Sequence, residues 1–197
     1  MSNKVIRKFK QLYFKYKRIL ITTSKSYAKS SDVDRWSKSK SLFTDWDERT
    51  LLLAQQIKPN SKVFEFGAAR LVLREAISDN CVYLHSDIVK RNDETLVFDL
   101  NKGLPEVPKV DYIVFSGVLE YIFEVEALLR HLASNTDNFL ISYATTDQTP
   151  DKVKRRYEGW VSDLNEMDIS NIADSIDMTL QIIGRWRTQT LYHISKK

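Results

Sequence analysis

The sequence predicts an α/β protein with one doubly wound, mostly parallel sheet that ends in an antiparallel hairpin. Short apolar strand candidates alternate with helical segments along the middle of the chain, as in a Rossmann-like sheet covered by helices on both faces. The last two strand candidates, residues 178–186 and 190–195, are so close that they must pair antiparallel. With 197 residues, the chain is long enough for a single domain of this kind.

Composition limits the class of protein. Hydrophobic residues make up 43% of the chain and aromatic residues 11%, which suits a packed globular core. The single cysteine, Cys81, excludes an internal disulfide and indicates a reducing, cytoplasmic environment. No apolar run is long enough to span a bilayer, no signal peptide is evident, and no metal site is predicted.

The formal net charge of +4 is unevenly distributed. Residues 1–40 carry twelve Lys or Arg against two Asp, a net charge of +10, whereas the remaining residues carry eighteen against twenty-four, a net charge of −6. The basic character therefore belongs to an N-terminal extension, residues 1–43, and the folded domain is expected at residues 44–197.

Residues 4–21 of this extension have helical spacing, with Phe9, Leu12, Tyr16 and Ile19 three or four residues apart and many Lys and Arg between them. Such a helix either packs on the domain with its basic side in solvent or lies on an anionic membrane surface. A nucleic-acid-binding arm is less favoured, because it does not need an apolar stripe. Residues 22–41, rich in Ser and Lys, predict a loop or a loosely held connector.

The domain starts with a helix that Thr44 or Asp45 caps and that runs to Ile57, before Pro59 ends it. A buried strand at 62–66, a turn at Gly67 and a helix at 69–77 follow. Residues 144–160 show no clear period. The remaining elements, in chain order, are strands at 81–85, 95–98, 110–115 and 138–143, and helices at about 119–133 and within 162–176.

Acidic or small residues follow four successive strands, where open parallel sheets bind ligands. The turn after the first strand is expected to present backbone N–H groups to a carboxylate or phosphate. Asp87 comes twenty residues after Gly67, the spacing at which a carboxylate meets a ribose diol. Because no phosphate-binding loop is present, these positions predict an adenosine-type ligand without a long phosphate tail. They are Glu65 with Gly67, Asp87, Asp99, and Ser116 with Gly117.

The segments FEFGAAR, HSD, VFDLN and DYIVFSGVLEYI, in this order and spacing, resemble the class I S-adenosylmethionine-dependent methyltransferases over roughly residues 44–197. The resemblance implies S-adenosylmethionine as the cofactor, with Glu65, Gly67 and Ala68 beside its methionine part. It places Asp87 at the ribose and Asp99 near the adenine amine, and the segment of Ser116, Gly117 and Val118 beside cofactor and substrate. The sequence departs from the family at Ala69 and Leu71, where glycines are usual, and at Glu120-Tyr121, where Glu-His is frequent.

The resemblance implies an enzyme that methylates a hydroxyl group of a sugar, a glycan precursor or another small molecule. Within the family, the chain resembles small methyltransferases of bacterial surface-polysaccharide biosynthesis. Together with the basic helix, this narrower resemblance suggests that the acceptor is linked to a lipid and that the protein is peripheral at the inner membrane face. Two alternatives remain open. One is a methyltransferase of RNA or another macromolecule that uses the basic arm, and the other is a non-catalytic, methyltransferase-like binding module.

An alcohol acceptor needs a general base. His85 and Glu120 are candidates, although a structural role is the simpler interpretation of each. The acceptor pocket is expected in the poorly patterned parts of the chain, where aromatic and Arg side chains suit sugars and anionic groups. Its candidates are Tyr143, Arg155, Arg156, Tyr157 and Trp160, with Trp36 or Trp46 from the N-terminal side.

Overall fold

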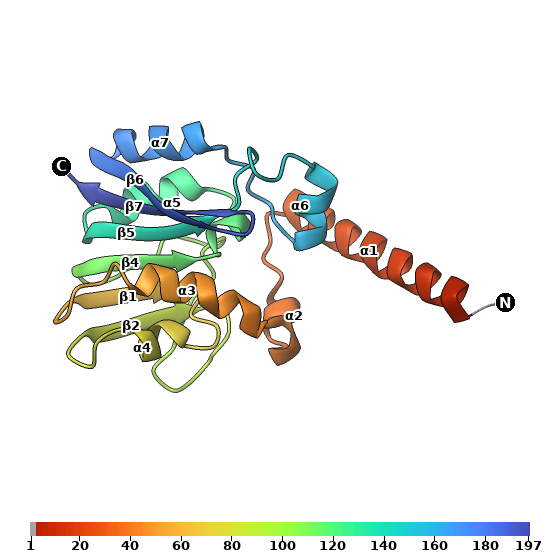
Figure 1. Cartoon of the computed structure of the whole chain (residues 1–197), viewed down its shortest axis with the longest axis horizontal. Coiled ribbons are helices and arrows are strands. Elements are labelled where there is room, and N and C mark those ends of the chain that lie inside the picture. The colour runs from red at the N-terminus through yellow and green to blue at the C-terminus, as the bar shows by residue number, and fades with distance from the viewer. Residues whose placement is uncertain (1–2) are drawn as a thin grey trace.

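One seven-stranded sheet forms the centre of the molecule, with strand order β3-β2-β1-β4-β5-β7-β6 (Figure 1). The computed structural model describes residues 3–197, and side chains from residue 6; the first two residues of the predicted extension lie outside this range. Strand β7 is antiparallel to both β5 and β6, and the other pairings are parallel, so the predicted fold class is confirmed. The strands are β1 (Lys62–Phe66), β2 (Val82–Asp87), β3 (Leu96–Val97), β4 (Val110–Ser116), β5 (Thr136–Tyr143), β6 (Met178–Trp186) and β7 (Gln189–Lys196).

Helices cover both faces of the sheet, which explains why β4 is almost entirely apolar. Successive side chains of a strand point to opposite faces. Ile113 and Phe115 of β4 join one core with α5 (Val125–Leu132) and α7 (Glu166–Ser175). Tyr112 and Val114 join a second core on the other face, with α3 (Asp47–Ala54) and α4 (Val72–Ala76).

The strand register brings the predicted ligand-binding residues to one edge of the sheet. Phe66 at the end of β1 is aligned with Ser86 on β2 and with Phe115 on β4. The residues that come next, Asp87 among them, therefore leave the sheet side by side. This arrangement is the one that the alternation of strands and helices predicted.

Several helices differ from the predicted ones. The first helix of the domain was predicted to run from a cap at Thr44 or Asp45 to Ile57, but α3 spans only Asp47–Ala54. Its N-cap position is Trp46, which makes no side-chain capping hydrogen bond, because residues 44–46 form a separate 3₁₀ turn. The helix expected from residue 69 begins at Val72, because Leu71 holds a left-handed backbone with φ of +62°. The helix expected at 119–133 is split into a 3₁₀ turn, η3 (Leu119–Tyr121), and α5. The segment 144–160 contains α6 (Lys152–Glu158), which the Asp151 side chain caps by accepting two backbone N–H groups.

The N-terminal extension is more ordered than a loose connector. Helix α1 (Asn3–Tyr27) is followed by α2 (Val33–Trp36) and by two 3₁₀ turns, η1 (Ser39–Ser41) and η2 (Thr44–Trp46). Arg35 donates to the carbonyl of Glu158 at 2.8 Å, and Arg91 donates to the carbonyl of Trp36 at 3.1 Å. Figure 1 shows α1 pointing away from the sheet, with its C-terminal part beside α6. Among the described helices, none is both long enough and apolar enough to cross a bilayer.

Candidate active site

A cavity opens at the carboxyl ends of the parallel strands, where the sequence predicted it. The space between its lining residues, including the solvent-filled opening, is about 1030 Å³. An adjoining recess shares Gly67 and Ser116 with the cavity and adds Glu65 and Ala68. All seven residues predicted to bind the cofactor thus line one of these two spaces: Glu65, Gly67, Ala68, Asp87, Asp99, Ser116 and Gly117.

Three residues of the turn after β1 have a left-handed backbone conformation, although only one of them is glycine. Gly67 has φ of +70°, Ala69 of +45° and Leu71 of +62°. A left-handed conformation costs a residue with a side chain roughly 1–2 kcal/mol, so Ala69 and Leu71 store backbone strain. Leu71 lines neither the cavity nor the recess, so the space for a ligand is retained.

Gly67→Ala is expected to lower the free energy of unfolding by about 2–3 kcal/mol. The new Cβ would lie 2.4 Å from Cγ2 of Val118, and the left-handed backbone would be strained as well. Chemical denaturation of the two proteins measures the difference. Gly103→Ala is the control, because its Cβ would meet nothing closer than 3.8 Å; an equal loss in both variants would contradict the prediction.

Backbone N–H groups of this turn are already occupied, which differs from the prediction that they would hold an anion. The N–H groups of Gly67 and Ala68 both donate to the carbonyl of Ser86, at 2.8 and 3.2 Å. The N–H of Ala69 donates to Oδ2 of Asp87 at 2.8 Å. An anionic group of a ligand must therefore find other donors. The recess contains two guanidinium groups, that of Arg49 and that of Arg70, which also pairs with Asp47 at 2.9 Å.

Asp87 is buried at the end of β2 and is fixed by three donors. Its Oδ2 accepts from the N–H of Ala69, as described above. Its Oδ1 accepts from the N–H of Val89 at 3.1 Å and from Nη2 of Arg91 at 3.0 Å. The side chains of Asp87 and Arg91 are 4% and 10% exposed, so this is a buried ion pair. Carboxylate oxygens accept more than one hydrogen bond each, and Asp87 lines the cavity with acceptor capacity left for hydroxyl groups.

Asp99 follows β3 and connects the cavity to the N-terminal extension. Its Oδ1 accepts from the hydroxyl of Ser31 at 2.6 Å and from the N–H of Asn101 at 3.0 Å. Within the described chain no group donates to its Oδ2, which leaves that oxygen for an amine of a ligand. Phe98 and Leu100, on either side of it, add apolar surface to the cavity wall.

Glu65 lies in the recess as a fully buried carboxyl group that accepts the Tyr83 hydroxyl. Burial raises the pKa of Glu65 to about 8, and the charge of Asp87 adds to this shift. The hydrogen bond from Tyr83 and the charge of Arg49 oppose it. The group is therefore mostly protonated at neutral pH.

The free energy of unfolding is expected to fall by roughly 2–4 kcal/mol between about pH 5 and about pH 8 because of Glu65. Its folded pKa is above the unfolded value of 4.5, so the folded state binds the proton more tightly. This contribution is fully present below pH 4.5 and is lost as the pH rises through 8. Denaturation curves across this range measure the slope. Glu65→Gln keeps an acceptor for Tyr83 and should flatten the slope; an unchanged slope would contradict the assignment.

The N-terminal extension forms one wall of the cavity. Trp36, predicted as a pocket residue, packs edge-on against the Tyr121 ring with centroids 5.0 Å apart. The Arg35 guanidinium lies 4.4 Å from the Trp36 ring centroid. The residues of this wall, in chain order, are Thr22, Lys25, Ser30, Ser31, Asp32, Arg35, Trp36 and Leu42, and Trp46 continues it just beyond the extension.

Arg49 is a central residue of the site that was not predicted from the sequence. Its buried guanidinium donates to the hydroxyl and the carbonyl of Ser116, both at 3.1 Å, and to Oε1 of Gln189 at 3.0 Å. Burial lowers its pKa, which the charge of Glu120 opposes. The sequence does contain an indication of this role. Arg49 lies at helical spacing between Trp46 and Leu53, on the face of the helix that packs against the sheet.

The two general-base candidates do not line the cavity. His85 is buried beside Asn92 and Thr95, with Nε2 at 3.1 Å from a side-chain oxygen of each. Glu120 is fully buried, and its Oε1 accepts from the N–H of Ala144 at 2.9 Å and from Nε2 of Gln189 at 2.8 Å. Burial raises the pKa of Glu120. Both side chains hold loops in place, in line with the simpler interpretation.

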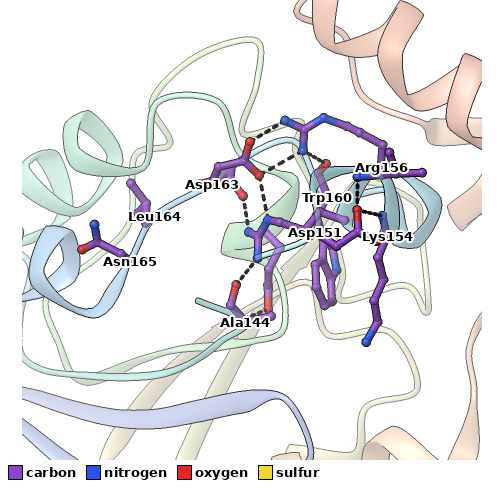
Figure 2. Close-up of polar contacts among 12 residues, drawn as sticks. Ala144, Asp151, Lys154, Arg156, Trp160, Asp163, Leu164 and Asn165 are labelled. Carbon is purple, nitrogen blue, oxygen red and sulfur yellow. Dashed lines mark hydrogen bonds and ion pairs between the residues drawn. The ribbon is translucent and has the colours of Figure 1, made fainter. Parts of the chain in front are cut away.

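The five predicted acceptor residues between 143 and 160 do not line the cavity either. Two neighbours of these residues, Gly159 and Val161, do line it. The Arg155 guanidinium is fully buried and donates to the carbonyls of Ala144 and Ser162, both at 2.6 Å, and to Asp163 at 2.7 Å. Figure 2 shows Arg156 beside the same Asp163. The hydroxyl of Tyr143 is 2.8 Å from that of Ser162, Arg18 lies over the Tyr157 ring, and Arg155 lies over the ring of Trp160.

No family model and no curated protein matches the sequence. Solved structures do resemble its fold. The plantazolicin methyltransferase BpumL, solved in complex with S-adenosylhomocysteine, is 13% identical, with a TM-score of 0.63, and the alignment covers 99% of this chain and 100% of that one. The 1,6-didemethyltoxoflavin-N1-methyltransferase of Burkholderia thailandensis is 13% identical, with a TM-score of 0.57 and coverage of 92% and 89%.

A third similar structure is CalO1, the methyltransferase in calicheamicin biosynthesis, in a form with S-adenosylhomocysteine bound. It is 13% identical with a TM-score of 0.58, and the alignment covers 77% of this chain. The chain spans about half, 54%, of the length of CalO1. At these identities the similarity concerns architecture, and the chain has the class I methyltransferase fold.

Proposed function

We propose that this chain, with its class I methyltransferase fold, is an S-adenosylmethionine-dependent enzyme that methylates a hydroxyl group of a sugar, a glycan precursor or another small molecule. One observation carries the proposal: Asp87 and Asp99, each at the end of a strand, line the same cavity as the glycine turn after β1. A ribose diol and an exocyclic amine are the groups that two such carboxylates would bind.

The residues present fit this cofactor. Asp87 would accept the ribose hydroxyls and Oδ2 of Asp99 the adenine amine, with Phe98 and Leu100 against the ring. In the recess, the ammonium group of the methionine part would favour the ionised form of Glu65 and pair with it, and Arg49 would bind the carboxylate of the methionine part. S-adenosylmethionine supplies an electrophilic methyl group on a cationic sulfur. The chain orients this group and the acceptor and excludes water, from which much of the rate acceleration of a displacement comes.

The acceptor would bind against the wall that the N-terminal extension contributes. Trp36 and Tyr121 offer aromatic surfaces, and Arg35 offers a cation, a combination that suits sugars and ring systems. Asp32 brings a carboxylate to this wall, where it accepts from the N–H of Arg35 at 3.2 Å as the N-cap of α2. We assign it the role of accepting the hydroxyl proton of the acceptor.

Isothermal titration calorimetry with S-adenosylmethionine tests the cofactor. A dissociation constant in the micromolar range is expected. The absence of binding at millimolar S-adenosylmethionine would contradict the proposal. Leu71 lines neither the cavity nor the recess, and Ala69 lines both with only a methyl side chain, so binding is expected although both positions lack glycine.

Asp32→Asn tests the acceptor side, because Asn is as good an N-cap as Asp but is not a base. With an acceptor found by screening hydroxylated sugars and glycan precursors, kcat should fall by roughly 10²–10⁴-fold, while cofactor affinity stays unchanged. Turnover equal to that of the wild type would remove Asp32 from the mechanism and leave the cofactor assignment standing.

A further inference from the structure

Helix α1 carries a row of large apolar side chains that face solvent. Phe9 is 70% exposed, Leu12 51%, Tyr13 63%, Tyr16 58% and Leu20 68%. At 3.6 residues per turn, these five fall on one side of the helix. Large exposed apolar patches on soluble proteins mark interaction sites.

The helix packs on the rest of the chain through its other, polar side. Arg18 lies over the Tyr157 ring and donates to the carbonyl of Glu158 at 3.3 Å. Thr22, one turn later on the same side, is 6% exposed, and Lys25 lines the cavity. Helix α1 therefore does not pack on the domain through its apolar stripe, as an ordinary amphipathic helix would. Within the described chain, no other segment covers the apolar side. Even Leu20, beside the packed region, is open to solvent.

The positive charge of α1 indicates which kind of partner binds its apolar side. Residues 3–27 contain no Asp or Glu, and their cationic residues are Lys4, Arg7, Lys8, Lys10, Lys15, Lys17, Arg18 and Lys25. Two copies packed through α1 would bring two cationic helices together without a neutralising acid. An anionic bilayer instead accepts apolar side chains between its headgroups and attracts the cations that flank them.

We propose that α1 is an interfacial helix that attaches the protein to the surface of an anionic phospholipid bilayer. Its apolar side enters the headgroup region, and the lysines along its two borders, Lys8, Lys10, Lys15 and Lys17, contact lipid phosphates. Because Thr22 and Lys25 line the cavity from the opposite side of this helix, the cavity lies within about one helix diameter, roughly 10 Å, of the membrane surface. An acceptor anchored in the bilayer would reach the site from there.

Sedimentation with vesicles tests this inference on the full chain. The protein should sediment with vesicles of phosphatidylcholine mixed with phosphatidylglycerol, should stay in solution with phosphatidylcholine alone, and should be released by salt. The triple variant Phe9→Gln, Leu12→Gln, Tyr16→Gln should bind the mixed vesicles at least about tenfold more weakly. Gln is a good helix former and all three positions are exposed, so the helix is retained.

Phe14→Gln is the matched control, because Phe14 is 63% exposed but lies on the side of Arg18, one turn away. It should retain most of the vesicle binding. Three outcomes would overturn the proposal: no sedimentation of the wild type at low salt, equal binding of the triple variant, or a wild-type dimer in sedimentation velocity that the triple variant abolishes. Salt-sensitive RNA binding that the triple variant leaves unchanged, without vesicle binding, would identify a nucleic-acid partner instead. None of these readouts depends on cofactor binding or catalysis.

Discussion

Asp87→Ala is expected to abolish detectable S-adenosylmethionine binding and to lower the free energy of unfolding by about 3–5 kcal/mol. The carboxylate is the proposed ribose acceptor, and it also neutralises Arg91, whose side chain is only 10% exposed. Removing it leaves a buried cation without a partner, and it frees the N–H of Ala69 from the hydrogen bond that fixes the turn. Calorimetry and chemical denaturation measure the two effects.

The double variant Asp87→Ala, Arg91→Met separates these effects. It removes the unpaired cation together with its partner, so most of the lost stability should return. Cofactor binding should not return, because no carboxylate then faces the ribose. A double variant that binds S-adenosylmethionine as tightly as the wild type would show that Asp87 does not contact the cofactor.

Arg155→Met should be the most destabilising change in the C-terminal half, at about 3–5 kcal/mol. The guanidinium is fully buried and ties the carbonyls of Ala144 and Ser162 to Asp163. Met fills a similar volume but leaves both carbonyls without their donor, and each unsatisfied buried group costs about 1–3 kcal/mol. The loop that carries Gly159 and Val161 to the cavity should loosen as well.

Thermal and chemical denaturation of Arg155→Met measures this loss. Arg185→Met provides the comparison, because the Arg185 side chain is 56% exposed and its distance to Glu166 is 3.5 Å, so about 0–1 kcal/mol is expected. If Arg155→Met were as stable as the wild type and only acceptor turnover fell, the residue would belong to the substrate pocket after all.

The sheet and the strand-end residues could be predicted because they follow from local patterns. Alternation of strands and helices determines a parallel sheet, and a parallel sheet brings the ends of its strands to one edge. Asp87 and Asp99 therefore had to lie near Gly67 once the strands were recognised. The short connection before Gln189 determined the antiparallel hairpin in the same way.

Side-chain direction in irregular segments could not be predicted in this way. Arg155 and Arg156 look like substrate-binding residues because arginine binds anions, but nothing local reveals that backbone carbonyls before and after them in the chain accept their hydrogen bonds. Helix α1 shows the same limit. Its apolar stripe was evident, but the side that packs on the domain depends on where α6 lies, and α6 itself has no clear apolar period.

Because the N-terminal extension forms one wall of the cavity, it limits how far the chain can be shortened from the N-terminus without opening the cavity. The change in charge suggests a cut near residue 43, but a chain that starts there would lack Ser31, which donates to Asp99, and Trp36, which covers Tyr121. Such a fragment would keep the sheet and open the cavity to bulk water along one side. The smallest fragment that keeps this whole wall therefore starts before Thr22, within α1, so the helix that points away from the sheet also supplies part of the cavity lining.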